Sequence, residues 1–298
     1  MAVEGRGRLP TRIILVRHGE SEGNVDQSKY CSVADSKILL TQEGLCQAEA
    51  CGATIRKIIE ETAEIDWKVY FYVSPYRRTL GTLRHIGKAF ERRRILGVRE
   101  EPRIREQDFG NFQKTKEMKI VKDTRVRFGR FFYRFPEGES AADVFDRVTS
   151  FLESLWRDMN RGLDSSTNLN LIIVSHGVTM RVFLMRWFKW TTEQYELLNN
   201  FQNCECRVMQ LGSGGEYSLA VHHSKEELEQ WGLSPEMIAD QEFRATANRG
   251  QWNGDWPWSG HTFFDHFEED SENEYCGDGN LLVTMPASKG CTHHLHTA

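Results

Sequence analysis

The sequence lacks any long apolar segment. It contains no run of the roughly eighteen apolar residues that a membrane-spanning helix requires, so no such helix is expected. The first residues, MAVEGRGRLPTR, lack the apolar core of a signal peptide and are too few to form a convincing transit sequence. We therefore expect a soluble cytoplasmic protein with no membrane partner.

The cysteines lack the spacing of a metal site. There are seven, an odd number, and no two of them form a C-x-x-C pair of the kind that marks a zinc site or a redox-active dithiol. Reduced, mostly buried thiols fit the cytosol. The sequence thus predicts no metal centre and no disulfide framework.

Strong net charge and a high apolar content are also absent. A formal net charge of −5 gives the whole molecule little attraction for nucleic acid or for a membrane surface. Only 39% of the residues are apolar, and the mean hydropathy is −0.55. Values this low in a chain of 298 residues predict that one stretch is polar and loosely structured.

That stretch is the C-terminal part. After a GSGG break the composition changes, and we expect residues 214–298 to form a partly disordered extension. Two short helical patterns, SKEELEQWG and PEMIADQEFRATA, lie within it. The tryptophans in QWNGDWPWSG indicate that the tail docks, either on its own domain or on a partner protein, and the sequence leaves both open.

The remaining chain alternates between apolar runs and helical patterns. Short runs at 13–16, 69–73 and 171–174 have the composition of strands buried on both faces, and a further strand is expected at 207–211. Helices are predicted to begin at Thr41, Arg78, Ser140 and near Val178, the second ending near Arg93. This alternation predicts an α/β fold, a three-layer α/β/α domain over residues 11–213 with a largely parallel central sheet, preceded by a tail of residues 1–10.

Polar residues follow three of the predicted strands. Because ligands bind at the carboxyl ends of parallel strands, we expect these residues to meet at one edge of the sheet. They include Arg17 and His18, then Arg78, and then His176. Guanidinium groups offer forked donors suited to phosphate oxygens, and imidazoles serve as nucleophile or donor. The pattern predicts a phosphate pocket that contains a nucleophile.

A histidine that attacks phosphorus needs an unprotonated ring nitrogen, nearby cations and a proton donor for the leaving oxygen. His18 is the candidate nucleophile, and Glu106 in RIREQDFGNF is the candidate acid, although Glu100 and Glu101 lie close to it. The Asn24 amide either holds a phosphate oxygen or caps a turn. Arginine and histidine already offset the phosphoryl charge, so no cofactor is expected.

Six motifs occur in the order found in one family. They are RHGESEGN at 17–24, LTQEGLCQA at 40–48, SPYRRTLGT at 74–82, REQDFG at 105–110, PEGES at 136–140 and VSHG at 174–177. Over residues 11–212 the chain resembles the histidine phosphatase superfamily, the phosphoglycerate mutase-like group. The resemblance implies a phosphohistidine on His18, proton donation by Glu106, and substrate binding by the two arginines, Asn24, His176 and Gly177. It also selects Arg78 over its neighbour Arg77 as the phosphate ligand.

Within that family, REQDFGNFQ departs from the LNERHYG-type sequence of cofactor-dependent mutases and favours a phosphatase. The tail resembles extensions of the plant members. The predicted function is hydrolysis of small phosphorylated metabolites. Mutase-type transfer, and a catalytically weak phospho-ligand-binding or scaffold protein, are the alternatives.

Residues 111–135 are rich in Lys, Arg and Phe and show no clean period, which indicates an insertion that acts as a lid. A cationic lid would guide an anionic phosphoester toward the pocket. Arginines between aromatic residues are also typical of RNA-binding segments, but we consider nucleic acid the less favoured partner.

Overall fold

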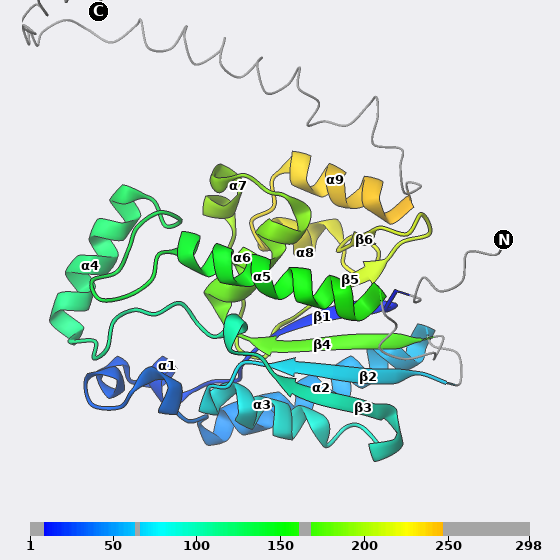
Figure 1. The fold of residues 1–298 in the computed structure, drawn as a ribbon, viewed down its shortest axis with the longest axis horizontal. Helices are drawn as coiled ribbons and strands as arrows, with labels where there is room; N and C mark the ends of the chain where they lie inside the picture. The colour runs from blue at the N-terminus through cyan, green and yellow to red at the C-terminus, as the bar shows by residue number, and fades with distance from the viewer. Residues whose placement is uncertain (1–8, 63–65, 161–167, 247–298) are drawn as a thin grey trace, which may run out of the picture. The chain divides into compact units, whose positions relative to one another are not determined.

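The computed structural model describes residues 9–62, 66–160 and 168–246, and a six-stranded sheet lies at its centre (Figure 1). The strand order is β3-β2-β4-β1-β5-β6. The first four of these strands run parallel to one another, whereas β5 pairs antiparallel with β1 and β6 pairs antiparallel with β5. The strands span Arg12–Arg17 (β1), Lys68–Val73 (β2), Ile95–Glu100 (β3), Leu169–Ser175 (β4), Cys206–Leu211 (β5) and Tyr217–Ser218 (β6).

Helices cover both faces of this sheet (Figure 1). Helices α2 (Gln42–Thr62) and α3 (Arg77–Gly87) lie on one face, and α5 (Ala141–Asn160) and α6 (Gly177–Phe188) lie on the other. Strand β1 shows why: Ile14 shares one core with α2, and Ile13 shares the other with α5. The predicted three-layer α/β/α fold with a largely parallel sheet is confirmed.

Two segments differ from the prediction. The helix expected to reach Arg93 ends at Gly87, and the chain then forms the short helix η3 (Arg92–Arg94) and the unpredicted strand β3. β3 lies at the sheet edge, where Val98 is 55% exposed, so it carries no continuous apolar run. The predicted lid contains a helix, α4 (Thr115–Phe128), none of whose residues is buried. A helix without a buried stripe has no apolar period to detect.

The expected domain end near residue 213 is corrected by the structure. Strand β6 and the helices α8 (Lys225–Gln230) and α9 (Pro235–Thr246) belong to the same core, in which Tyr217, Leu228 and Met237 are at most 2% exposed. Both helices coincide with the short helical patterns predicted there. Residues 247–298, which include the tryptophans of QWNGDWPWSG, and residues 1–8 lie outside the described residues.

Several short elements complete the described chain. They are α1 (Glu22–Val25), η1 (Gln27–Cys31), η2 (Asp35–Lys37), η4 (Pro102–Ile104) and α7 (Thr192–Leu197).

No helix in residues 9–62, 66–160 or 168–246 is long and apolar enough to cross a membrane.

Candidate active site

The carboxyl ends of β1, β2 and β4 bring the predicted phosphate-binding residues together. β1 and β2 each pair with β4, so the residues that follow these strands lie side by side. The ring centroids of His18 and His176 are 5.3 Å apart, and the Arg78 Nε lies 3.2 Å from the His18 Nε2. The segments after three strands therefore form one site, as the sequence predicted.

The His18 ring is oriented for nucleophilic attack. Its Nδ1 lies 2.7 Å from the carbonyl oxygen of Gly19, which accepts a hydrogen bond if Nδ1 carries the proton. The Nε2 lone pair then accepts from Arg78. Burial, and next the charges of Arg78 and Arg17, hold the pKa of His18 well below its usual range. The imidazole is therefore neutral at pH 7, and the unprotonated Nε2, which accepts from Arg78, is the ring atom that can act as a nucleophile.

Two motif residues explain how the loop that carries His18 is held. The backbone N–H of Gly19 donates to the Thr82 hydroxyl at 3.0 Å, which gives the last residue of SPYRRTLGT a role. Gly44, the glycine of LTQEG, lies against the same loop, because a Cβ built on Gly19 would be 2.5 Å from the Gly44 carbonyl oxygen. Thr41 caps the helix there as predicted, its Oγ1 accepting from the Gly44 N–H at 3.0 Å.

Each of the two arginines is anchored by hydrogen bonds from its Nη1 atom. The Arg78 Nη1 donates to the carboxylate and to the carbonyl oxygen of Asp35, both at 2.7 Å, and Arg78 is only 2% exposed. The Arg17 Nη1 donates to the Phe201 carbonyl at 2.6 Å, and its Nε has no partner among the described residues. Both arginines line the cavity. A phosphate oxygen would supply an acceptor for their remaining N–H groups.

Glu106 is the predicted acid, and it shares the cavity with His18. It lines the cavity with His18, whereas Glu100 and Glu101 do not, and Glu101 instead pairs with Arg103 at 2.7 Å. Burial raises the pKa of Glu106 above its usual range, against the opposing charge of Arg78. A carboxyl group that keeps its proton closer to neutral pH is suited to general acid catalysis.

His176 lies next to His18 and is fully buried. Its Nε2 lies 2.8 Å from the Ser74 hydroxyl, and its Nδ1 has no partner among the described residues. Burial and the charge of Arg78 hold its pKa well below the usual range, so it is neutral. Gly177 does not line the cavity. A Cβ there would meet the Asn200 Oδ1 at 2.1 Å, so this glycine allows a close packing contact.

Asn24 caps a turn, which is one of the two alternatives left open by the sequence. Its Oδ1 accepts from the Ser21 N–H at 3.0 Å and from the Asn203 Nδ2 at 3.1 Å, so it caps α1. The residue also lines the cavity. Its carbonyl oxygen is thus committed to the cap, and only its amide N–H groups remain to face a ligand.

The individual residues of the cavity's outer wall were not predicted, although Gln113, Thr115, Met118 and Lys122 lie in the predicted lid. The cavity measures about 260 Å³, and α4 and η1 meet along it, with the Gln113 N–H donating to the Tyr30 carbonyl at 3.0 Å. The Lys122 Nζ reaches the Gln27 Oε1 at 3.4 Å. The side chains of this wall come from segments that show no hydrophobic periodicity. The one signal in the sequence was that Phe109 and Gln113 lie close to Glu106 along the chain. The unpredicted lining residues are Gly23, Gln27, Tyr30, Asp35, Phe109, Gln113, Thr115, Met118 and Lys122.

Among the described residues, no group of three or more His, Cys, Asp or Glu side chains could hold a metal ion.

The fold, the paired histidines and the arginines at the strand ends define a class of phosphoryl-transfer enzyme. Residues 13–223 match the sequence profile of the histidine phosphatase superfamily (branch 1), and the chain belongs to this family. It is 63% identical over 270 residues to the phosphoglycerate mutase-like protein AT74 of Arabidopsis thaliana, covering 89% of this chain and 85% of that protein.

More distant relatives have names that state an activity. The broad-range acid phosphatase DET1 of Saccharomyces cerevisiae is 32% identical over 289 residues, covering 68% of this chain and 86% of the yeast protein. Among solved structures, a mycobacterial glucosyl-3-phosphoglycerate phosphatase in complex with VO3 has a TM-score of 0.51 at 20% identity, covering 67% of this chain and 89% of that one. At that identity the likeness concerns the fold alone.

Proposed function

We propose that this chain is a phosphatase that hydrolyses phosphomonoesters of small metabolites through a phosphohistidine on His18. One observation carries the proposal: a neutral His18, whose Nε2 contacts Arg78, shares a cavity with a carboxyl group of raised pKa, Glu106. The first is a nucleophile and the second is a proton donor.

The reaction proceeds in two steps. The His18 Nε2 attacks phosphorus in line, the ester P–O bond breaks, and Glu106 gives its proton to the leaving oxygen. Water then attacks the phosphohistidine, the Glu106 carboxylate accepts the proton of that water, and the P–N bond breaks to release phosphate and neutral His18. Arg17 and Arg78 offset the charge on the transferred group in both steps.

The size and charge of the cavity support a small anionic substrate. About 260 Å³ accommodates a phosphoryl group and a small organic part, and Lys122 of the lid adds positive charge at the outer end. Two relatives have names that contain "phosphatase", which supports hydrolysis. The mutase-like name of the Arabidopsis relative favours the alternative, in which the phosphoryl group returns to a substrate oxygen.

Phosphoenzyme trapping tests the proposal. The wild type, mixed with a radiolabelled phosphomonoester and quenched in alkali, should carry label that is stable in alkali and labile in acid, as expected of phosphohistidine. His18→Ala should carry none and should not turn over phenyl phosphate. His85→Ala is the matched control, because this histidine does not line the cavity and contacts Glu49 of α2. Equal rates for the wild type and His18→Ala would contradict the proposal.

The fate of the label separates hydrolysis from mutase activity. In a phosphatase the label passes to water at the rate of turnover. In a mutase it persists until a second hydroxyl compound accepts it. Loss of label only on addition of a phosphoglycerate would favour the mutase.

The cytoplasm remains our proposed compartment. The five cysteines among the described residues are all free thiols, which fits a reducing environment. Cell fractionation with an antibody to the chain tests this proposal, and recovery from an organelle fraction would contradict it.

A further inference from the structure

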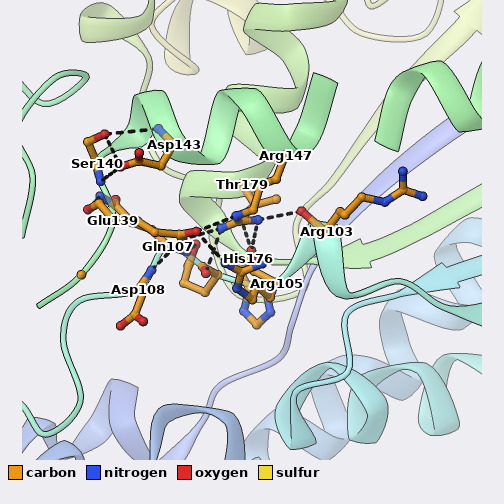
Figure 2. Close-up of polar contacts among 12 residues, drawn as sticks. Arg103, Arg105, Gln107, Asp108, Glu139, Ser140, Asp143, Arg147, His176 and Thr179 are labelled. Atoms are coloured by element: carbon orange, nitrogen blue, oxygen red, sulfur yellow. Dashed lines mark hydrogen bonds and ion pairs between the residues drawn. The ribbon is translucent and has the colours of Figure 1, made fainter. Parts of the chain in front are cut away.

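The loop that carries Glu106 is held by one arginine of α5. Arg147 donates from Nη1 to the carbonyl oxygens of Arg103 and Arg105, at 2.7 and 2.9 Å, and from Nη2 to the carbonyl oxygen of Glu106 at 3.0 Å. Figure 2 shows Arg147 reaching from the helix into this loop. A single guanidinium group therefore satisfies three main-chain acceptors in a segment that forms neither a long helix nor a strand.

Glu139, from PEGES, orients that arginine and holds the loop from the other side. Its carboxylate accepts from the Arg147 Nε at 3.0 Å, from the Arg105 Nη2 at 2.6 Å and from the Asp108 N–H at 3.0 Å (Figure 2). Its main-chain carbonyl accepts from the Gln107 Nε2 at 2.7 Å. Burial acts to raise the pKa of Glu139, but the hydrogen bonds and charge of Arg147 outweigh it and hold the pKa below its usual range.

The loop is also tied to the strand and helix on either side of His176. The Ser175 hydroxyl donates to the Ile104 carbonyl at 2.7 Å, and the Thr179 hydroxyl donates to the Arg105 carbonyl at 2.6 Å. These contacts fix the start of the loop. At Glu106 itself, the main-chain carbonyl is bound by Arg147, and the carboxylate accepts from the Gln107 N–H at 3.1 Å.

Neither Arg147 nor Glu139 lines the cavity, so neither touches a substrate. Their effect has to pass through the residue that they hold. A general acid works only within hydrogen-bond reach of the leaving oxygen, and a misplacement of about 1 Å costs on the order of 100-fold in rate.

We propose that Arg147, oriented by Glu139, is the positioning residue of the general acid, and that it sets the distance of Glu106 from the leaving oxygen. This inference rests on the proposed phosphatase function. An arginine is required because its rigid fork reaches three carbonyl oxygens together, whereas a lysine ammonium cannot.

The test uses leaving groups of different acidity. Dinitrophenolate leaves without a proton, whereas the alkoxide of a glycerol phosphate needs one from Glu106. We expect Arg147→Met to lower kcat/KM on glycerol phosphate about 100-fold and kcat/KM on dinitrophenyl phosphate by less than about threefold, because kcat/KM reports phosphoenzyme formation and not the later step in which Glu106 acts as the base. Glu106→Gln should show the same selectivity, and Arg147→Lys should recover part of the loss. Arg157→Met is the matched control, because Arg157 lies exposed on the same helix and, within the described part of the chain, donates only to the Ser154 hydroxyl.

An equal loss on both substrates, or no loss on either, would overturn the inference, because a purely structural role does not discriminate between leaving groups. If Arg147→Met does not fold, Glu139→Gln replaces it with the same expectation. Failure of the phosphatase proposal is recognised separately, since the wild type would then match His18→Ala on both substrates.

A second readout needs no turnover. The Glu106 carboxyl carbon, assigned by its loss in Glu106→Gln, is titrated by ¹³C NMR in the wild type and in Arg147→Met. Release of the loop exposes the carboxyl group to water, so its pKa should fall toward the ordinary range. An unchanged pKa in the folded variant would overturn the inference.

Discussion

Replacing Gly44 by alanine should move the loop that carries His18. A Cβ at this position of α2 would lie 2.0 Å from the carbonyl oxygen of Glu20 and 2.9 Å from its carbonyl carbon and nitrogen. These are backbone atoms, which cannot rotate away as a side chain could. The helix and the loop that contains His18 must therefore separate by about 1 Å or more to restore an ordinary contact distance near 3.5 Å.

Two quantities follow from this displacement. Forcing a methyl group into close-packed structure costs about 1–3 kcal/mol, offset by about 0.5–1 kcal/mol that alanine gains over glycine within a helix. We expect Gly44→Ala to lose about 1–2 kcal/mol of unfolding free energy in urea. A shift of about 1 Å at His18 should lower the rate of phosphoenzyme formation about 100-fold.

Gly87→Ala is the matched control. Gly87 ends α3, and a Cβ there meets nothing within 4 Å, so the same change should leave activity intact and slightly raise stability. Urea denaturation and single-turnover labelling are measured on both variants. A Gly44→Ala protein as active and as stable as Gly87→Ala would refute the argument that this glycine sets the position of the loop.

Three further predictions concern the acid, the arginine anchor and the core. In the wild type, kcat on an alkyl phosphate should fall as pH rises through the raised pKa of Glu106, because the acid loses its proton. Glu106→Gln should lack this fall. If kcat of the variant still falls at high pH, Glu106 is not the general acid. Asp35→Ala removes the carboxylate that lies 2.7 Å from the buried Arg78, and it should lower the free energy of unfolding, measured by thermal denaturation, by about 3 kcal/mol. Added phosphate should raise Tm more in this variant than in the wild type, and equal shifts in Tm would argue against the anchoring role of Asp35. Ile172→Ala in β4, at 0% exposed, should lose about 2–5 kcal/mol in urea, whereas Val98→Ala in β3, at 55% exposed, should lose less than about 1 kcal/mol; similar losses would contradict the assigned burial.

The parts of the fold that the sequence predicted are those in which burial is complete. β1, β2 and β4 have helices on both sides, so their apolar runs are continuous and readable. β3 and α4 have no fully buried residue, and their sequences carry no periodic signal. The sequence therefore reveals the interior of this domain but not the edge strand β3 or the helix α4 within the predicted lid.

The misplaced domain boundary has a different cause. The GSGG segment lies between β5 and β6, and the Gly212 N–H donates to the Glu216 carbonyl at 2.7 Å, closing a hairpin. Gly215 has a φ of +89°, which favours glycine. Glycine enrichment marks tight turns as well as linkers, and the apolar residues that follow this turn are too widely spaced to reveal that they belong to the same core.

The candidate site likewise has a part that the sequence predicts and a part that it does not. His18, Arg78 and His176 follow buried strands, so their relative positions are set by a sheet register that the sequence already implies. The outer wall depends on α4 and η1, whose contact, such as that between Lys122 and Gln27, joins segments distant in sequence through polar side chains. Family motifs therefore identify the chemistry, because chemistry depends on the rigid interior. We expect substrate choice to depend on the predicted lid, which packs few apolar groups, so changes in α4 should alter which phosphoester is used while leaving the proposed phosphohistidine step intact.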